Sequence, residues 1–336
     1  MTVSFEVIKL KFITPLHIGR GWGELDHSEQ ILHSDTIKSA IFFALIQLFP
    51  EWKNKAKEYF EGFTLSSCFP FCKEELFLPK LQLKRKFDFE AIEPNRQAKT
   101  SKKIEYISFK IFKDYINNYN NEQIVINKNQ LSKNYKFVFE KSLDDHGNIF
   151  LDHVQQRVKI EQFTKTVPFF ADRIFFNEDC GLYFLAKFQN EAIRKDVLRA
   201  ISFLGTLGIG TDRTVGNGFF HFDENTDVSG IEISADNTDA YASLGLYLPK
   251  KEELEIIDMD NSSWGLIKRE GYMAGSEYVK FRHLLKKSIY MFTEGSVFKT
   301  TEKPVGKFVN VKPEWNDSEM HDVWRCGMPL FIPVKL

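Results

Sequence analysis

The chain has 336 residues, 43% of them apolar and 15% aromatic, and a formal net charge of −1 at pH 7. This length suits two modest domains or one large one, and we favour two. Domains that bind polyanions in general are usually strongly basic, so the overall charge excludes a general nucleic-acid binder but leaves room for local basic patches.

The first predicted elements are a strand, a loop and a helix. Residues 3–13 alternate as a strand, but the alternation shifts by one residue midway, which indicates a bulge or burial on both faces. A loop with three glycines follows. We expect Ser34 to cap a helix whose apolar residues recur every three or four positions until Pro50 ends it.

A long insertion is predicted in the middle of the chain. Residues 68–79 supply a short extended element, and 81–165 is then charged, rich in asparagine and only partly periodic. Compact domains rarely carry so much irregular chain, so we interpret 81–165 as an insertion. After it, residues 168–176 and 182–188 predict a β-hairpin.

A second helix and a last strand complete this unit. Apolar residues recur every four positions from Ile193 to Ile201 and predict a helix that Asn190 caps, and residues 219–222 form a strand. The order β-α-β-β-α-β predicts an α+β fold class of the ferredoxin-like, RRM-like kind, whose sheet faces commonly stack RNA.

The predicted boundaries divide the chain after residue 225. Residues 1–225 form the N-terminal RRM-like domain, with the insertion at 81–165 and a glycine-rich loop at 205–218. Residues 226–336 carry short strand patterns and one helical turn, which predict a C-terminal β-rich domain.

The most informative segment is FLGTLGIGTDRTVGNGFFHF at 203–222, where five glycines surround Arg213. Glycine permits positive φ and close approach of a ligand, so we expect a surface of backbone amides that suits phosphates. Phosphate loops for ATP and NAD follow a strand and open a helix, whereas this segment follows a helix and precedes a strand. We therefore exclude both and expect no cofactor.

Several segments together resemble the RAMP superfamily, the RNA-binding subunits of CRISPR effector complexes. Besides the glycine-rich loop they are ILHSDTIKSA at 31–40, VPFFADRIFF at 167–176 with GLYFL at 181–185, and TEGSVF at 293–298. Their order along nearly the whole chain is most similar to the group that forms the fourth subunit of type III-A, or Csm, complexes.

This resemblance implies a non-catalytic subunit that grips the 5′ handle of the guide RNA (crRNA) in antiviral defence. The implied protein partners are the large polymerase-like subunit and the backbone RAMP subunit. The resemblance also implies two ferredoxin-like halves, and a thumb within the insertion that is pushed between guide and target RNA.

The residues that we expect to bind RNA lie in four parts of the chain. The first loop and the start of the first helix supply His17, Arg20, Trp22, His33 and Ser34. The insertion supplies Lys84, Arg85, Lys86 and Arg157, with Lys102 and Lys103 as further candidates. The glycine-rich loop supplies Gly205, Gly208, Gly210, Thr211, Arg213, Thr214 and Gly216, and the C-terminal half supplies Arg282. For Arg213 a salt bridge that fixes the loop is the alternative, and Trp22 is as suited to packing as to stacking.

Two other classes of function stay open. One is a metal-independent endoribonuclease that processes CRISPR repeat RNA, with His17 or His33 as acid or base and Arg20 or Lys38 stabilising charge on the phosphate. The other is a structural adaptor that touches only proteins. The sequence has no HExxH or GxSxG motif, so metalloprotease and serine hydrolase readings have no support.

Charge and cysteine usage complete these expectations. Basic residues outnumber acidic ones nine to four in 84–113 and ten to four in 268–312, whereas 223–260 has eleven acidic and two basic residues and is assigned to a protein neighbour or to solvent. The four cysteines are expected to form no disulfide framework and no metal site. No apolar run approaches 18 residues, so we expect a cytoplasmic protein.

Overall fold

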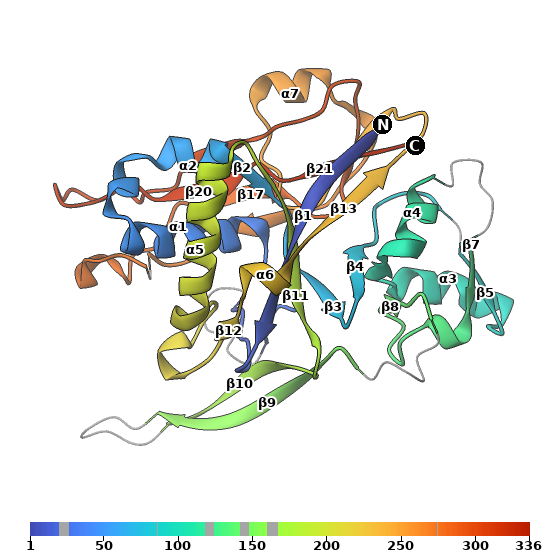
Figure 1. Ribbon diagram of the computed structural model, residues 1–336, viewed down its shortest axis with the longest axis horizontal. Helices are drawn as coiled ribbons and strands as arrows, with labels where there is room; N and C mark the ends of the chain where they lie inside the picture. Colours follow the sequence, from blue (N-terminus) through green and yellow to red (C-terminus); the bar gives the residue numbers. More distant parts are fainter. Residues whose placement is uncertain (20–26, 86, 118–123, 142–147, 160–166, 274) are drawn as a thin grey trace.

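The computed structural model describes residues 1–19, 27–85, 87–117, 124–141, 148–159, 167–273 and 275–336. Within these ranges, nine strands form a central sheet in the order β12-β1-β11-β3-β4-β6-β8, with β13 beside β1 and β2 beside β11 (Figure 1). The strands are β1 (Thr2–Phe12), β2 (Phe63–Leu65), β3 (Phe69–Cys72), β4 (Glu75–Pro79), β6 (Tyr106–Ser108), β8 (Phe137–Val138), β11 (Cys180–Phe188), β12 (Phe220–His221) and β13 (Val228–Ser234).

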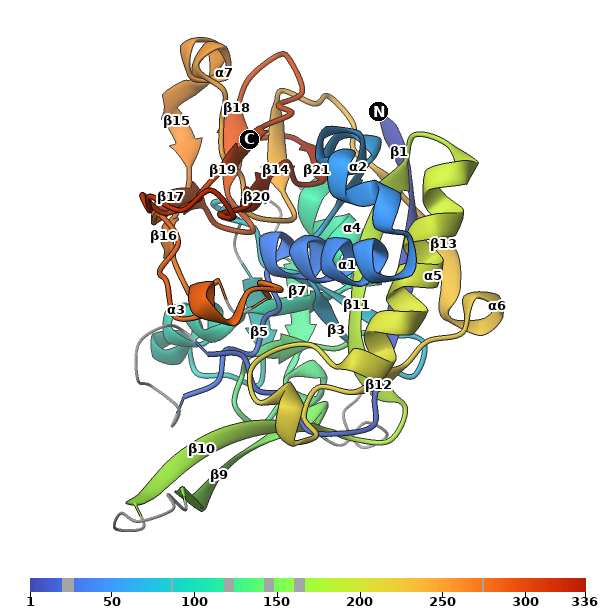
Figure 2. The same ribbon diagram turned by 90° about the vertical axis from the view of Figure 1, so that its left-hand side faces the viewer.

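Helices cover one face of this sheet. Figure 2 shows α1 (Ser34–Leu48) and α5 (Glu191–Leu207) in front of the central strands. In the chain, α1 is followed by η1 (Pro50–Asn54) and α2 (Ala56–Gly62), and α5 is followed by η4 (Arg213–Val215). Strand β1 is buried on both sides, because Val7 belongs to one hydrophobic core and Ile8 to the other, and neither has exposed surface. The predicted burial on both faces is therefore confirmed.

The two helix starts differ from each other. Asn190 caps α5 as predicted, since its Oδ1 accepts a hydrogen bond of 2.9 Å from the amide of Ile193. The predicted cap of α1 is wrong: α1 begins at Ser34 and its N-cap is His33, whose side chain makes no capping bond. The Ser34 hydroxyl instead accepts a bond of 2.8 Å from the amide of Leu246.

The predicted insertion is more regular than its sequence indicated. It contains β5 (Phe87–Glu90), α3 (Pro94–Lys103), α4 (Phe109–Asn117), β7 (Ile124–Asn127) and η2 (Lys128–Gln130), and β6 and β8 extend the central sheet. The expectation of irregular chain is wrong because α3 buries only Thr100 and so has no apolar stripe that periodicity could reveal. We call residues 87–141 the insert lobe.

A long hairpin, which we call the thumb, protrudes from the body (Figure 1). It consists of β9 (Phe150–Lys159) and β10 (Val167–Phe176), which pair along their whole lengths. The predicted hairpin of 168–176 with 182–188 is wrong, because β11 pairs with β1 and β3 instead. Strand β11 is buried from Cys180 to Ala186, which requires a central place in the sheet.

The C-terminal part is rich in strands, as predicted. Its four-stranded sheet has the order β15-β18-β14-β21, and two further pairs are β16 with β17 and β19 with β20. Their bounds are β14 (Ala240–Ser243), β15 (Asp258–Ser263), β16 (Leu266–Arg269), β17 (Ile289–Phe292), β18 (Val297–Lys299), β19 (Lys307–Asn310), β20 (Trp324–Gly327) and β21 (Phe331–Val334). Short helices are α6 (Glu224–Asp227), α7 (Lys251–Ile256) and η5 (Val279–Phe281). The mixed α+β class is confirmed.

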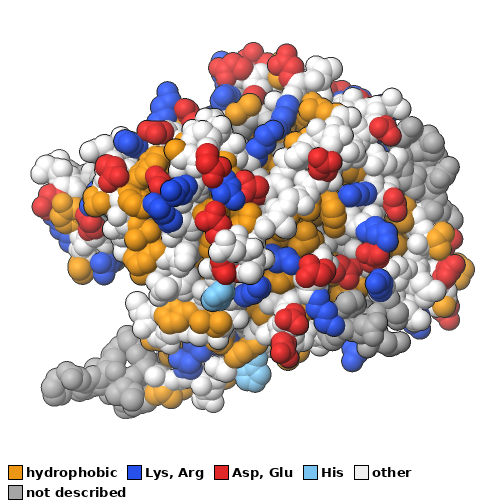
Figure 3. All heavy atoms as spheres, in the orientation of Figure 1, with side chains coloured by type: hydrophobic (Ala, Val, Ile, Leu, Met, Phe, Trp, Pro, Cys, Tyr) orange, Lys and Arg blue, Asp and Glu red, His pale blue; other side chains and the backbone are white. Residues whose placement is uncertain are grey.

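Three further features bear on the expectations from composition. Cys72 and Cys180 lie opposite each other on β3 and β11 and form a disulfide, so the expectation of unpaired cysteines is wrong for this pair, while Cys68 and Cys326 are free and buried. None of the helices in the described ranges combines the length and apolarity needed to cross a membrane. Basic and acidic side chains are interspersed over the face in Figure 3, in keeping with the net charge of −1.

Candidate nucleic-acid interface

The glycine-rich loop packs tightly against its own protein. Helix α5 ends at Gly208, which has a φ of 75°, and Gly210 and Gly218 have φ values of 93° and 73°. A Cβ at Gly210 would collide with the carbonyl oxygen of His17, and one at Gly218 with that of Ile209. Both glycines are therefore required by positive φ and by close backbone contact.

Most backbone amides of the loop are used internally. The amide of Thr211 donates to the His17 carbonyl at 2.8 Å, and that of Gly218 to the Pro15 carbonyl at 2.8 Å. The predicted amide surface is thus wrong for the base of the loop, where Gly205 and Gly208 are also packed against neighbouring residues. At the tip, the amides of Gly210, Asp212, Arg213 and Thr214 donate no hydrogen bond within the described part of the chain, so the amide surface stays a prediction there.

The tip borders a cleft of about 810 Å³, which we call the Arg213 cleft. Three segments that are far apart in the sequence line it: Gly210 to Thr214 of the loop, Phe43 to Lys53 of α1 and η1, and Gly275 to Arg282 near η5. In Figure 2 the yellow loop and the orange segment around η5 both lie below α1. The fold therefore brings the predicted residues Thr211, Arg213, Thr214 and Arg282 together.

Arg213 has an open guanidinium held by an aromatic ring. Its Cζ lies 5.2 Å from the centroid of the Phe43 ring, a cation–π arrangement. No carboxylate of the described residues pairs with Arg213, so the alternative of a loop-fixing salt bridge is wrong within those ranges. Arg282 likewise keeps its charge unpaired there, and its Nε donates to the Ser276 carbonyl at 2.9 Å.

A second cavity of about 310 Å³ adjoins the cleft and shares Arg213 with it. Arg269, Arg325 and Lys286 also line it, around the carboxylate of Asp35. Arg269 binds Asp35 through two bonds of 3.1 Å, and Arg325 through one of 2.8 Å. Burial would raise the pKa of Asp35, but the two guanidinium groups hold it well below its usual range. Burial, together with the charge of Arg325, lowers the pKa of Lys286 to about 8.

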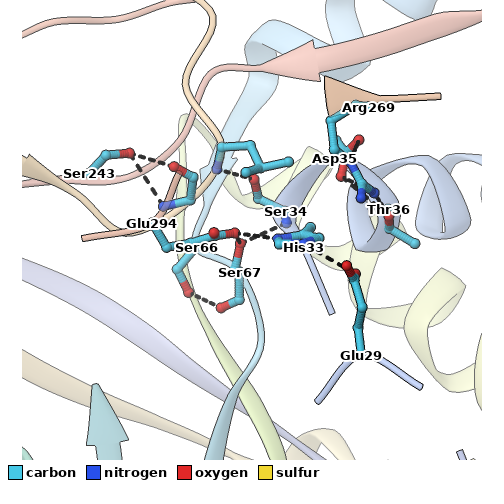
Figure 4. A network of polar contacts seen from close by, with 12 residues as sticks. Glu29, His33, Ser34, Asp35, Thr36, Ser66, Ser67, Ser243, Arg269 and Glu294 are labelled. Atoms are coloured by element: carbon cyan, nitrogen blue, oxygen red, sulfur yellow. Dashed lines mark hydrogen bonds and ion pairs between the residues drawn. The ribbon is translucent and has the colours of Figure 1, made fainter. Parts of the chain in front are cut away.

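His33 belongs to a buried ionic network rather than to an open surface (Figure 4). Its Nδ1 lies 2.8 Å from Glu294 of the C-terminal part and its Nε2 lies 3.3 Å from Glu29. Burial would lower the pKa of His33, but the charge of Glu294 and hydrogen bonds to both carboxylates outweigh it and raise the pKa to about 10. His33 and Ser34 therefore join the two halves, and their predicted place on an open RNA surface is wrong.

The other predicted residues are dispersed. His17 is 1% exposed and its Nδ1 lies 2.7 Å from the Asp172 carbonyl, so its predicted exposed role is also wrong. Arg85 donates to the Lys335 carbonyl at 2.5 Å beside exposed Lys84, and Arg157 lies on the thumb. Gly216 has open space around its Cα. Arg20, Trp22 and Lys86 lie outside the described residues.

These positions bear on the endoribonuclease alternative. A histidine with a pKa near 10 stays protonated at neutral pH and cannot act as a base, and His33 is bound on both nitrogens. Lys38 is fully buried, donates to the carbonyls of Phe60 and Phe63, and has its pKa lowered by burial. The described residues among those named for that chemistry, His17, His33 and Lys38, are all buried and thus do not share an open site.

Sequence reasoning missed three residues of this region. Phe43 and Lys53 line the Arg213 cleft, but an amphipathic helix gives no sign of which exposed side chain faces a cleft. Lys53 is paired with Glu277 at 2.8 Å. Arg173, on β10 at the root of the thumb, is 5% exposed, and its Nε and Nη2 have no hydrogen-bond partner in the described ranges. The sequence of a predicted strand does not show whether one of its arginines is buried or whether its guanidinium nitrogens have hydrogen-bond partners.

Comparison with known proteins agrees with this architecture. The family model of the RAMP superfamily matches residues 9–221, and that of the CRISPR Csm4 C-terminal domain matches residues 236–334. The chain is 25% identical over 382 residues to the CRISPR system Cms protein Csm4 of Methanocaldococcus jannaschii, which covers 97% of this chain and 96% of the relative. It is 27% identical over 344 residues to the Streptococcus thermophilus protein of the same name, covering 98% and 99%.

Solved structures share the fold. A chain in the crystal structure of a Csm3-Csm4 subcomplex of the type III-A CRISPR-Cas interference complex superposes with a TM-score of 0.64 at 20% identity, covering 99% of this chain and 100% of that chain. A chain of a Csm1-Csm4 cassette in complex with pppApA gives 0.59 at 18% identity, covering 99% of both. The model of the CRISPR Csm4 C-terminal domain matches the C-terminal part, and because the RAMP model matches more than half of the residues, the chain belongs to the RAMP superfamily.

Proposed function

We propose that this chain is a non-catalytic, guide-RNA-binding subunit of a type III-A CRISPR interference complex, acting in antiviral defence. It grips the 5′ handle of the crRNA in the Arg213 cleft. The observation that carries the proposal is the Arg213 guanidinium, which together with four amides at the tip of the glycine-rich loop has no acceptor or carboxylate partner among the residues that the structure describes.

The chemistry of the tip suits a phosphate. Backbone N–H groups and an arginine are the usual donors to phosphate oxygens, and bonds to a charged acceptor are the stronger ones. Thr211 and Thr214 are exposed at the same tip and supply hydroxyls. Arg282 adds a second cation from the opposite wall, so a phosphate backbone that passes through the cleft meets positive charge on two sides.

The protein partners follow from the similar chains, which occur with Csm3 and with Csm1. We propose that this chain likewise links the large polymerase-like subunit to the backbone RAMP subunit. We also infer that the N-terminal half is ferredoxin-like, because β13, β1, β11 and β3 are neighbours in that order, with α1 and α5 on one face.

The thumb fits the proposed contact with target RNA. It protrudes from the body and carries Arg157, and the buried Arg173 stands at its root with two guanidinium nitrogens that have no hydrogen-bond partner in the described ranges. The charge of Asp212 acts on Arg173, but a buried guanidinium with unsatisfied donors is costly unless an anion binds it. A phosphate of the guide–target region would supply that anion.

The direct test is removal of the Arg213 charge. Arg213→Ala is expected to lower the affinity for repeat-derived handle RNA by about ten- to a hundredfold, because a charge-assisted hydrogen bond contributes ~1.5–3 kcal/mol. Arg199→Ala, at an exposed position of α5, is the matched control. Fluorescence anisotropy over a salt series measures both. Equal affinities for the two variants, or a flat response to salt, would refute the site.

The absence of catalysis needs its own assay. Repeat RNA incubated with the purified chain without metal is expected to stay intact on a gel. Defined cleavage that disappears in His17→Ala or His33→Gln would replace this proposal with the endoribonuclease. If the assembled particle shows no crosslink between this chain and RNA, the chain is a protein-only adaptor.

A further inference from the structure

The insert lobe contains a basic cavity that the Arg213 cleft does not include. Its volume is about 430 Å³, and its walls come from α3, from the residues just before it, and from η2. Four cations line it, Arg96, Lys99, Lys103 and Lys128, against one carboxylate, that of Glu93. In Figure 1 the lobe lies on the other side of the central sheet from α1 and α5. We call it the lobe cavity.

The topology of the lobe brings these cations together. Strands β5 and β7 pair in parallel, with Glu90 opposite Asn127, so the start of α3 and Lys128 follow the same end of the pair. Loops beyond the carboxyl ends of parallel strands are the usual place for ligands in α/β units. The cavity thus lies beyond the carboxyl ends of a parallel strand pair, where α/β units commonly bind ligands.

Most cations of the cavity are not neutralised by the described residues. Arg96, Lys99 and Lys103 are spaced by three and four residues, so they share one face of α3 and repel one another. Lys99, Lys103 and Lys128 have no ion pair among the described residues, and the pair of Arg96 with Glu93 is exposed on both sides. An anion bound between them would remove this repulsion.

The backbone of the cavity wall is strained at two points. Ala91 and Tyr135 both line it, and their φ values of 61° and 63° place both in the left-handed region that side chains disfavour. Such strain clusters where a site must hold groups in fixed positions. The Tyr135 ring, 5.5 Å from the Lys103 Nζ, adds an aromatic surface beside the cations.

We propose that the lobe cavity is a second RNA-binding site, which takes phosphates of a single-stranded segment on its cations and a base beside Tyr135. The inference rests on the proposed function to the extent that it assumes an RNA-bound particle, but it uses none of the residues of the Arg213 cleft. Convergent cations in a hollow, with an aromatic ring beside them, are the arrangement that single-stranded nucleic acid requires. An acidic protein segment would not need the ring or the hollow.

The test compares two triple variants of the full chain that remove equal charge. Lys99→Gln/Lys103→Gln/Lys128→Gln empties the cavity of three cations. Lys57→Gln/Lys195→Gln/Lys251→Gln removes three exposed cations elsewhere in the chain. Labelled oligouridylate is titrated with each variant over a salt series, and thermal melting confirms that both are folded.

The cavity variant is expected to bind at least tenfold more weakly than the control. Its slope of log K against log salt should be shallower by about 2, because each phosphate contact with a single strand contributes about 0.7. Equal affinity and slope for the two variants would overturn the proposal, and would leave an acidic protein partner as the ligand. If either variant melts early, crosslinking of wild-type chain to 4-thiouridine RNA decides: crosslinks in 91–135 support the site, and crosslinks only elsewhere overturn it.

Adding Arg213→Ala separates the two proposals. The effects on log K should add, because the two sites share no residue. If only the cavity variant weakens binding, the Arg213 cleft fails and this inference stands. If only Arg213→Ala weakens binding, the reverse holds.

Discussion

The start of α1 and the tip of the glycine-rich loop both carry ionisable residues but use them in opposite ways. At the start of α1, His33 and Asp35 are buried and each is ion-paired with residues of the C-terminal part. At the loop tip, Arg213 is partly exposed and rests on an aromatic ring, and no carboxylate of the described residues pairs with it. The comparison shows that pairing, more than residue type, separates a structural joint from a surface that is free to bind.

The largest expected effect is at the joint. Asp35→Ala leaves the buried guanidinium groups of Arg269 and Arg325 without their carboxylate, which should lower the free energy of unfolding by about 3–5 kcal/mol. Arg213→Ala, which breaks no ion pair in the described ranges but loses the cation–π contact with Phe43, should lower it by no more than about 1 kcal/mol. Urea denaturation of both variants measures the contrast. A stable Asp35→Ala protein would show that the joint does not hold the halves together.

The joint should also respond to pH. The pKa of His33 is raised from 6.5 to about 10, so its stabilising contribution is complete below pH ~6.5 and is lost as the pH rises through about 10. The unfolding free energy should therefore fall more steeply between these values in the wild type than in His33→Gln. Lys286, whose pKa is lowered to about 8, acts in the opposite direction in both proteins and cancels in the difference. Parallel pH profiles would contradict the charged state of His33.

The loop itself offers a smaller contrast between two glycines. Gly210→Ala places a Cβ against the His17 carbonyl at a φ of 93°, whereas Gly216→Ala meets no atom within 4 Å at a φ of 92°. The first should destabilise the chain by ~2–3 kcal/mol and the second by ~1 kcal/mol, since both are strained but only one collides. Urea midpoints compare them directly. Equal losses of stability in the two variants would mean that backbone strain alone, without the collision at Gly210, explains why glycine is needed at both positions.

These contrasts explain what the sequence could predict. The elements with apolar periodicity, such as β1 and α5, were predicted correctly because burial leaves a pattern in the sequence. Helix α3 was not predicted, because a polar helix has no such pattern. The pairing of β10 was predicted wrongly, because β10 pairs with β9 while the buried strand β11 lies in the centre of the sheet. Thr211, Arg213, Thr214 and Arg282 line one cleft in the structure, and their binding of RNA stays a prediction from the glycine segment and the family resemblance.

The same reasoning failed for His17, His33 and Ser34. Their residue types suit both binding and internal hydrogen bonds, and only the three-dimensional structure brings Glu294 and Leu246 to them. The partner lies 261 residues away from His33 in the chain, beyond any local pattern. Polar residues near a predicted loop therefore indicate a site only when their charges stay unpaired in the fold.

The smallest expected effect concerns the Phe43 ring, which contacts the Arg213 guanidinium. Phe43→Leu keeps an apolar side chain on α1 but removes the ring 5.2 Å from the Arg213 guanidinium, an interaction of ~0.5–1 kcal/mol. The guanidinium would then lose its fixed orientation, so handle RNA should bind about two- to fivefold more weakly while the urea midpoint changes little. Phe42→Leu, at the neighbouring position packed against Tyr59 and Phe60, should show the reverse, a loss of stability with unchanged RNA affinity. If both variants affect binding equally, Phe43 is a packing residue and Arg213 needs no ring to hold it.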